Sequence, residues 1–357
     1  MNRIYSKFLF ALLAMLFLNG QLLAQFTITL AKNAAPSQQN GLYYSLPQTM
    51  LQLDFIIRES VYEKGPLSDY AETYFEGSDY IDYDAVTYEM LDVRMSSQTS
   101  PDPNATFFVG IMNGRGGVKP EFSLLPNGII RGVGTELNLS EIPATNEQPA
   151  CAAETKTSSN FLVLNSSGKS NGQLAKEVAD KIEEIRKSKY YLISGDVEMA
   201  SNPETFKVMY QKLDEMEQEY LSLLTGKRTE RIITKTLYVI PSKEVPTQTV
   251  AKFSETEGLI AGTGGSGSPI VVQTLSLNST AGINAPSTSA IESMTYENKL
   301  MYRIPEMAHI KVTYQGHILL EDRQTVNQLG VIQMAPLLNT NLLFDPMTGQ
   351  IVNMKMQ

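Results

Sequence analysis

The segment from residue 69 to residue 89 has the side chains of this sequence best suited to chemistry or binding. It contains five tyrosines among seven carboxylates. A tyrosine presents a flat apolar ring with a polar hydroxyl, which suits the face of a sugar or the surface of a protein. The sequence therefore predicts a surface that binds a protein or glycan partner. Its candidate residues are Tyr70, Tyr74, Tyr80 and Tyr83.

The carboxylates of the same segment allow three other interpretations. Asp82-Tyr83-Asp84 starts like a calcium-binding loop, but no glycine or distal glutamate completes that loop. Two of the carboxylates could act as general acid and general base in glycoside hydrolysis, although their spacing selects no pair. The third interpretation is structural, with the tyrosines half in the core and the acids in solvent. We therefore assign no catalytic residue and no metal ligand.

A second candidate is the phosphate-binding pattern around Gly168-Lys169-Ser170. An apolar run, Phe161 to Leu164, comes before it, and a predicted helix follows it. A phosphate-binding loop requires a glycine where Val163 stands, because a side chain there obstructs the approach of the backbone to phosphate. Ser170 is also explained as the cap of the helix. We expect no nucleotide to bind here.

Two further patterns are less specific. The glycine-rich stretch Gly262 to Gly267 is not followed by an amphipathic helix, so we expect a loop there and no dinucleotide site. His309 and His317 are the two histidines of the chain. Two imidazoles without a nearby cysteine or carboxylate pair make a poor metal site. The sequence predicts no cofactor.

Two long amphipathic helices are predicted over residues 170–226, because apolar residues recur there at the helical period. Ser170 and Ser201 each begin a capping box. Gly195 and Gly226 fit the glycine that ends a helix. We expect the apolar stripes to be packed. The glutamates that lie off the second stripe, and that we expect in solvent, are Glu215, Glu217 and Glu219.

The chain on either side of these helices has the alternation and turn signals of β-strands. Asn127-Gly128 predicts a hairpin turn, and Ile56-Ile57 interrupts an alternating strand as a β-bulge does. We predict an α+β fold with two mainly antiparallel β regions linked by a central antiparallel helical hairpin. The predicted parts are a signal peptide (1–24), an N-terminal β-rich region (25–169), the helical hairpin (170–226) and a C-terminal β-rich region (227–357).

The first 24 residues have the order of a secretory signal peptide. Arg3 and Lys7 precede an apolar run, Phe8 to Leu18, and small residues lead to Ala24. We expect export to the periplasm or the outer-membrane surface, with cleavage after Ala24. The apolar run is too short for a comfortable membrane span, so we expect no transmembrane segment after cleavage.

The charge of the chain bears on its class of partner, and its cysteine content bears on what stabilises the fold. Lys and Arg number 29 against 38 Asp and Glu, for a formal net charge of -9. An acidic chain without a basic patch is not typical of a protein that binds nucleic acid. The single cysteine, Cys151, cannot form an intramolecular disulfide. A hydrophobic core must therefore hold the fold.

Four short motifs carry a resemblance to one family. They are Tyr44-Ser45-Leu46-Pro47, the segment from Gly65-Pro66 to Phe75, Ser194-Gly195-Asp196-Val197 and Tyr302-Arg303-Ile304-Pro305. With these motifs the chain resembles an uncharacterised family of exported proteins from Gram-negative gut bacteria, catalogued as a domain of unknown function. The resemblance covers most of the mature chain and implies an envelope location. It implies no activity, and no catalytic residue carries over.

These observations favour an exported, non-catalytic cell-envelope protein that binds or scaffolds a protein or glycan partner. The alternative is a hydrolase of envelope or dietary polysaccharide that uses paired carboxylates. A deep cleft with two convergent carboxylates would favour the hydrolase. An exposed tyrosine-rich or helical patch would favour the binding protein.

Overall fold

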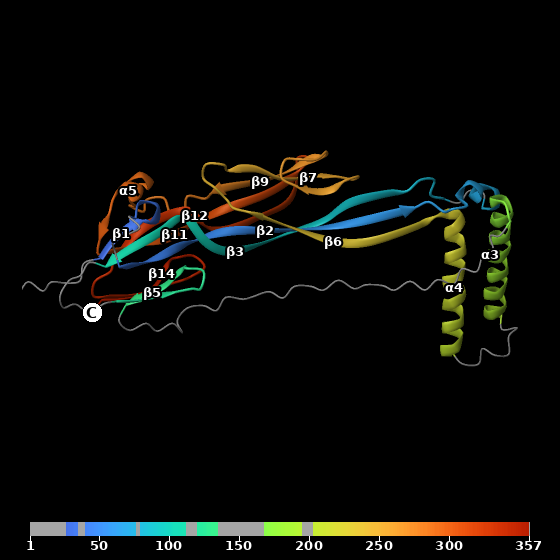
Figure 1. The fold of residues 1–357 in the computed structure, drawn as a ribbon, viewed down its shortest axis with the longest axis horizontal. Helices are drawn as coiled ribbons and strands as arrows, with labels where there is room; N and C mark the ends of the chain where they lie inside the picture. Colours follow the sequence, from blue (N-terminus) through green and yellow to red (C-terminus); the bar gives the residue numbers. More distant parts are fainter. Residues whose placement is uncertain are drawn as a thin grey trace, which may run out of the picture.

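The protein is an elongated molecule with two long helices at one end and β-sheets along the rest (Figure 1). The computed structural model describes residues 26–34, 40–75, 79–111, 120–134, 168–194 and 203–356. The predicted signal peptide, Cys151 and the apolar run from Phe161 to Leu164 lie outside these residues. The described strands form three sheets in which neighbouring strands run antiparallel.

The first sheet runs along most of the molecule. In spatial order it contains β10 (Tyr296–Glu297), β1 (Phe26–Leu30), β3 (Ala85–Ile111), β2 (Gly41–Glu63) and β6 (Lys227–Val239). Strand β2 has 23 residues and β3 has 27, so each is roughly 80 Å long at about 3.3 Å per residue. Near the helices this sheet narrows to the ends of β2, β3 and β6 (Figure 1). We call this part the stalk; it comprises residues 57–63, 85–90 and 227–233.

The second and third sheets cover two different parts of the first. In spatial order the second contains β12 (His317–Pro336), β11 (Lys299–Tyr314), β9 (Ser268–Ser276), β7 (Thr247–Ser254) and β8 (Gly258–Ala261). The third contains β14 (Ile351–Met356), β13 (Thr340–Phe344), β5 (Ile130–Gly134) and β4 (Glu121–Leu124). The predicted hairpin at Asn127-Gly128 is confirmed, because β4 pairs with β5 and Gly128 has a φ of 86°. Glycine adopts that backbone conformation without steric cost.

Two hydrophobic cores fill this β body. The end core includes Phe26 and Phe344 and joins strands of the first, second and third sheets. The middle core lies between the first and second sheets and includes Phe55 and Ile310. Strands β2 and β11 contribute to both cores, and each has a shift in register at a proline, Pro47 in β2 and Pro305 in β11. Proline has no N–H for the ladder, and the regular pairing of each strand is interrupted where it passes from one core to the other.

The register between β2 and β3 shifts between Ile56 and Ile57, but the extra residue is Leu91 of β3, and β2 pairs with β6 without interruption there. The prediction that β2 itself bulges at Ile56-Ile57 is therefore wrong, because the bulge lies in the partner strand. Beyond this point β2 leaves the middle core and enters the stalk. The extra residue of a bulge increases the local twist of a strand. Just beyond it, Tyr88 of β3 still packs against the middle core, and its backbone N–H donates to the Glu255 carbonyl at 2.8 Å.

Both predicted long helices are confirmed. The helical segments are η1 (Ala31–Asn33), η2 (Ser68–Tyr70), α2 (Ala71–Tyr74), α3 (Asn171–Ser194), α4 (Pro203–Thr225) and α5 (Thr288–Ser293). Ser170 forms the expected capping box, with Gln173 N donating to Ser170 Oγ at 3.3 Å and Ser170 N donating to Gln173 Oε1 at 2.9 Å. Gly226 ends α4 with a φ of 83°. The other proposed caps, Gly195 and Ser201, lie outside the described residues. No helix in the described parts of the chain has the length and apolar character needed to cross a bilayer.

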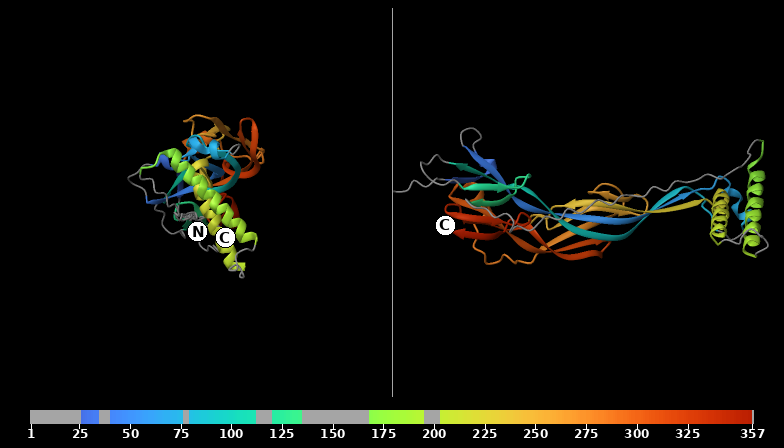
Figure 2. Two further views of the ribbon diagram at one scale, coloured as in Figure 1. Left: turned by 90° about the vertical axis from the view of Figure 1, so that its right-hand side faces the viewer. Right: turned by 90° about the horizontal axis from the view of Figure 1, so that it is seen from below.

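The helices are not central in space. Helix α4 leads directly into β6, which returns along β2 with Lys227 opposite Glu63. As a result α3 and α4 lie side by side at the far end of the stalk (Figure 2). The strands that precede and follow the helices share the first and third sheets, so the predicted central hairpin between two β regions is not confirmed. Helical periodicity locates the helices along the chain, but the pairing of β2 with β6 locates them in the molecule.

Candidate functional site

The four candidate tyrosines do not share one environment. Tyr70 and Tyr74 are half-buried and pack against the apolar residues of α3 and α4. Tyr80 and Tyr83 are 42% and 72% exposed. They flank Ile81, whose backbone N–H donates to the Thr225 carbonyl at the end of α4. Tyr80 and Tyr83 are therefore open to a partner, and binding by the four tyrosines stays a prediction.

Three carboxylates of this segment bond to other parts of the chain, and one of them, Glu89, accepts a hydrogen bond from Arg58 at 2.6 Å. Asp84 accepts a hydrogen bond from the Lys64 backbone N–H at 2.6 Å, and Asp69 accepts one from the Lys64 ammonium at 2.9 Å. The bond to Asp69 raises the pKa of the Lys64 ammonium. Within the described ranges, no three His, Cys, Asp or Glu side chains converge on a point that could hold a metal ion. Glu76, a further carboxylate of the segment, lies outside those ranges.

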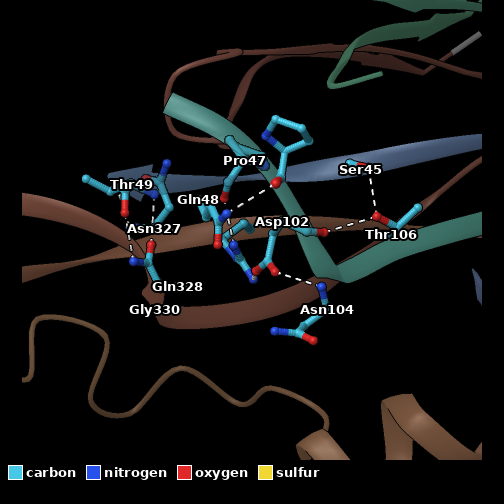
Figure 3. Close-up of polar contacts among 12 residues, drawn as sticks. Ser45, Pro47, Gln48, Thr49, Asp102, Asn104, Thr106, Asn327, Gln328 and Gly330 are labelled. Atoms are coloured by element: carbon cyan, nitrogen blue, oxygen red, sulfur yellow. Dashed lines mark hydrogen bonds and ion pairs between the residues drawn. The ribbon is translucent and has the colours of Figure 1, made fainter. Parts of the chain in front are cut away.

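A buried ion pair joins the strands where the end core meets the middle core (Figure 3). Arg303 of β11 donates to Asp102 of β3 at 2.8 Å and to the carbonyl oxygen of Pro47 at 2.6 Å. Both charged side chains are 6% exposed. Burial lowers the pKa of the Arg303 guanidinium, and Asp102 opposes this shift. Because a buried charge is costly without a partner, the pair holds β2, β3 and β11 in one arrangement.

A second set of polar bonds ties β12 to β2 at the same junction (Figure 3). The side-chain amide of Gln328 accepts from the Thr49 N–H at 2.8 Å and donates to the Thr49 carbonyl at 2.9 Å. The Asn327 backbone N–H donates to the Thr49 hydroxyl at 3.0 Å. These bonds satisfy backbone groups of β2 that face β12. We interpret the junction as structural, with Asp102 and Arg303 at its centre.

The buried carboxylates of the described residues are bonded to protein donors. Glu306 accepts four hydrogen bonds from Ser279 and Thr280 at 2.6 to 3.1 Å. Burial raises the pKa of Glu306, but these bonds outweigh it and hold the value at about 2. The pKa values of Glu59 and Glu217 are also lowered. A general acid requires a raised pKa, so these three side chains do not support the hydrolase alternative.

The helical end of the molecule has a core of its own. We call η2, α2, α3 and α4 together the helical tip. Val178, Ile182 and Leu224 are fully buried there, in a cluster separate from both β cores. The tip is attached to the chain that leaves the stalk, since the Leu67 N–H donates to the carbonyl oxygen of Leu223 at 2.9 Å.

Glu217 is buried, so the prediction that it lies on a solvated face is wrong. It accepts hydrogen bonds from Arg186 at 2.6 Å and from Lys189 at 2.7 Å. Lys189 also donates to Asp214 at 2.7 Å. Burial raises the pKa of Glu217, but the bonds from the two cations outweigh it and lower the pKa overall. Glu217 is buried because the contact between α3 and α4 extends beyond the apolar stripe of α4 and includes the flank on which Glu217 lies.

The end of the tip away from the stalk exposes apolar side chains. A groove of about 520 Å³ lies between the two helices there. Tyr191, Val208 and Met209 in this groove are 53%, 58% and 39% exposed. The other lining residues are Ser188, Leu192, Lys212 and Leu213. An exposed helical patch of this kind favours the binding protein over the hydrolase.

Sequence reasoning missed the pair of Asp102 and Arg303 and the exposed end of the tip. Asp102 stands between two prolines inside a strand, and Arg303 interrupts an otherwise apolar strand motif. Charged residues are unusual at both positions, and this was the sign in the sequence that the two side chains could be buried and paired. The pairing itself spans 201 positions of sequence, and no local pattern reports a contact at that separation.

Comparison with known proteins gives a family and no relative of known function. Residues 40–352 match the family model described as "Domain of unknown function (DUF4831)". Neither a curated protein nor a solved structure matches the chain. The matched range includes all four motifs on which the resemblance rested. Two of them, around Pro47 and Arg303, meet in the buried junction.

Proposed function

We propose that this chain, which belongs to that family, is an exported cell-envelope protein that binds or scaffolds a protein or glycan partner without catalysing a reaction. One observation carries the proposal. The helical tip stands at the end of a three-stranded stalk, away from the β body (Figures 1 and 2). It has its own core, and it exposes tyrosines and other apolar side chains.

The architecture supports this function because it separates two surfaces along one molecule. The stalk is formed by three strands paired in continuous register, from Ile57 to Glu63 in β2. A sheet bends less readily along its strands than a single connecting segment, so the stalk sets the distance between body and tip. Tyr80 and Tyr83 are exposed where the stalk meets the tip.

The location in the envelope is tested by fractionation of the source cells. We expect the protein in the periplasmic or outer-membrane fraction, with an N-terminus at Gln25. Phe26 is 1% exposed and belongs to the end core, so cleavage within the strand that follows would remove core residues. Cytoplasmic protein that retains Met1 would overturn the proposal.

Partner binding is tested by placing a photo-activated phenylalanine analogue at Tyr83 in the source cells. Tyr43 is the control position, because it is 51% exposed but lies in the part of β2 that belongs to the body. We expect a cross-linked protein or glycan adduct from position 83 and none from position 43. Equal adducts from both positions, or none from either, would contradict the assignment of this surface.

A further inference from the structure

The two helices of the tip divide into halves of different character. The distal half comprises residues 186–194 of α3 and 203–212 of α4, and the basal half comprises 171–185 and 213–225. Five large apolar side chains of these helices are exposed, and all five lie in the distal half. They are Tyr190, Tyr191, Ile193, Val208 and Met209.

Charge divides the helices at the same place. The distal half carries five cations and one anion, whereas the basal half carries two cations and eight anions. The distal half therefore has a net charge of +4 and the basal half one of -6. The residues that connect the two helices include two further acids, Asp196 and Glu198. With them counted, the distal end still has a positive net charge and the basal half a negative one. This positive end belongs to a chain with a net charge of -9.

Several distal cations bond to acidic residues of the basal half and still reach solvent. Arg186 bonds to Glu217 while its side chain is 51% exposed, and Lys187 bonds to Glu183 at 63% exposure. Long cationic side chains of this kind keep an apolar stem along the helix and a charged head in water. Lys212 lines the groove beside Tyr191, Val208 and Met209, and its side chain is 51% exposed.

The exposed apolar side chains point in different directions around the helices. Tyr191, Val208 and Met209 line the groove. Ile193 follows Tyr191 by two residues, which is about 200° around a helix. A partner helix seated in the groove would cover the first group and leave Ile193 and Tyr190 in water. A lipid environment that surrounds the whole end of the tip would cover all five exposed apolar side chains.

We propose that the distal half of the helical tip docks on the surface of an anionic lipid bilayer. Tyrosines and aliphatic side chains enter the boundary between headgroups and acyl chains, and the surrounding cations contact anionic headgroups. The helices lie in the interface and do not cross it. The inference extends the proposed function by naming a contact for the tip, and it rests on that function only for the envelope location.

The test uses the absence of tryptophan from the chain. Tyr191→Trp places a single fluorophore in the groove, and Tyr238→Trp places one on β6 at a residue that is 56% exposed. Each mature variant is mixed with vesicles of phosphatidylglycerol and phosphatidylethanolamine, or of phosphatidylcholine alone. We expect a blue shift of emission for Tyr191→Trp with the anionic vesicles, little shift with phosphatidylcholine, and none for Tyr238→Trp.

Flotation of the same vesicles separates the apolar and the charged contributions. Tyr190→Ser/Tyr191→Ser/Ile193→Ser should abolish flotation, and Lys207→Gln should weaken it roughly five-fold at low salt. The matched control is Ile232→Ser/Tyr238→Ser on β6, whose two side chains are 67% and 56% exposed. This control should float like the parent. Because all substituted side chains are exposed, unchanged melting temperatures verify that each variant folds.

Three results would overturn the inference. They are no shift with any vesicle, an equal shift for Tyr238→Trp, and a shift without lipid that accompanies the mass of a dimer, which would assign the tip to a second copy of the chain. Vesicle binding by a protein found in the cytoplasm would defeat the proposed function and leave the lipid contact standing. An envelope protein that ignores the vesicles would defeat the lipid contact alone.

Discussion

The β body and the helical tip bury their apolar residues in different ways. In the body, two further sheets cover the first, so that Leu53, Phe55 and Ile310 are fully buried. In the tip, η2 and α2 cover the basal half of the helices, and the distal half is a two-helix layer with nothing across its groove among the described residues. The apolar side chains of the body are therefore covered by its sheets, whereas the tip leaves five large apolar side chains exposed at its distal half.

Charged residues show the same contrast. The body buries an ion pair at 6% exposure on each side, whereas the tip places Lys189 and Glu217 at 11% and surrounds them with exposed partners. Loss of a charged partner costs more where less water remains to replace it. The contrast predicts that substitutions lower the free energy of unfolding most at the buried junction of the body and least at the surface of the tip.

The largest effect is expected at the buried junction. Asp102→Ala leaves Arg303 buried without its carboxylate and should lower the free energy of unfolding by about 3 to 5 kcal/mol. The control is Lys32→Ala, which removes an ion pair with Glu292 whose side chains are 58% and 48% exposed. An exposed pair contributes about 0 to 1 kcal/mol. Denaturant unfolding measures the free energy of unfolding of both variants. Equal decreases in the two would refute the claim that burial makes the Asp102–Arg303 pair important for stability.

The next effect depends on pH and concerns Glu306. Its pKa falls from 4.5 to about 2 in the folded protein, which corresponds to about 3 kcal/mol of stability. Because the folded pKa is the lower one, this stability is present above about pH 4.5 and is lost as the pH falls toward 2. The free-energy difference between the parent and Glu306→Gln should therefore shrink across that range. A difference that stays constant from pH 6 to pH 2.5 would contradict the assignment.

In the tip, Glu217→Ala should cost about 2 kcal/mol, because a charge-assisted network with Arg186 and Lys189 is lost. Glu215 bonds to Lys212 at 2.6 Å on the same helix, and Glu215→Ala should cost about 0.5 kcal/mol or less. Thermal unfolding compares the two. If both variants melt alike, Glu217 is solvated as the sequence pattern suggested.

The smallest effect is expected on the groove. Leu213 is half-buried between the tip core and the groove, so Leu213→Ala should cost about 1 kcal/mol, less than the 2 to 5 typical of a fully buried leucine. Val208 is 58% exposed, and Val208→Ala should change stability by less than about 0.5 kcal/mol. Chemical denaturation checks the pair. If Val208→Ala lowers the free energy of unfolding as much as Leu213→Ala does, the groove is covered in the folded protein.

Local patterns in the sequence predicted the elements that have local causes. The helices, the capping box at Ser170 and the turn at Gly128 each arise from residues a few positions apart. The bulge predicted at Ile56-Ile57 lies instead at Leu91 of the partner strand. The register of β6 on β2 joins residues more than 160 positions apart. That pairing decides where the helices lie, and periodicity carries no information about it.

The candidate site was predictable only in part, for a similar reason. The tyrosine-rich segment was visible in composition, but the fold covers Tyr70 and Tyr74 and exposes Tyr83. Glu217 was misplaced because a helical stripe describes one face, whereas α3 also contacts the flank of α4. The exposed distal half became recognisable once the structure showed which part of the stripe is covered.

The contrast between body and tip is tested most directly by hydrogen exchange. Full-length mature protein is exchanged with and without phosphatidylglycerol–phosphatidylethanolamine vesicles, and peptides are followed by mass spectrometry. We expect exchange to slow in residues 186–194 and 203–212 when vesicles are present, while β2 and β11 exchange as before. Slower exchange confined to the sheets, or no change in the tip, would contradict a lipid contact at the tip.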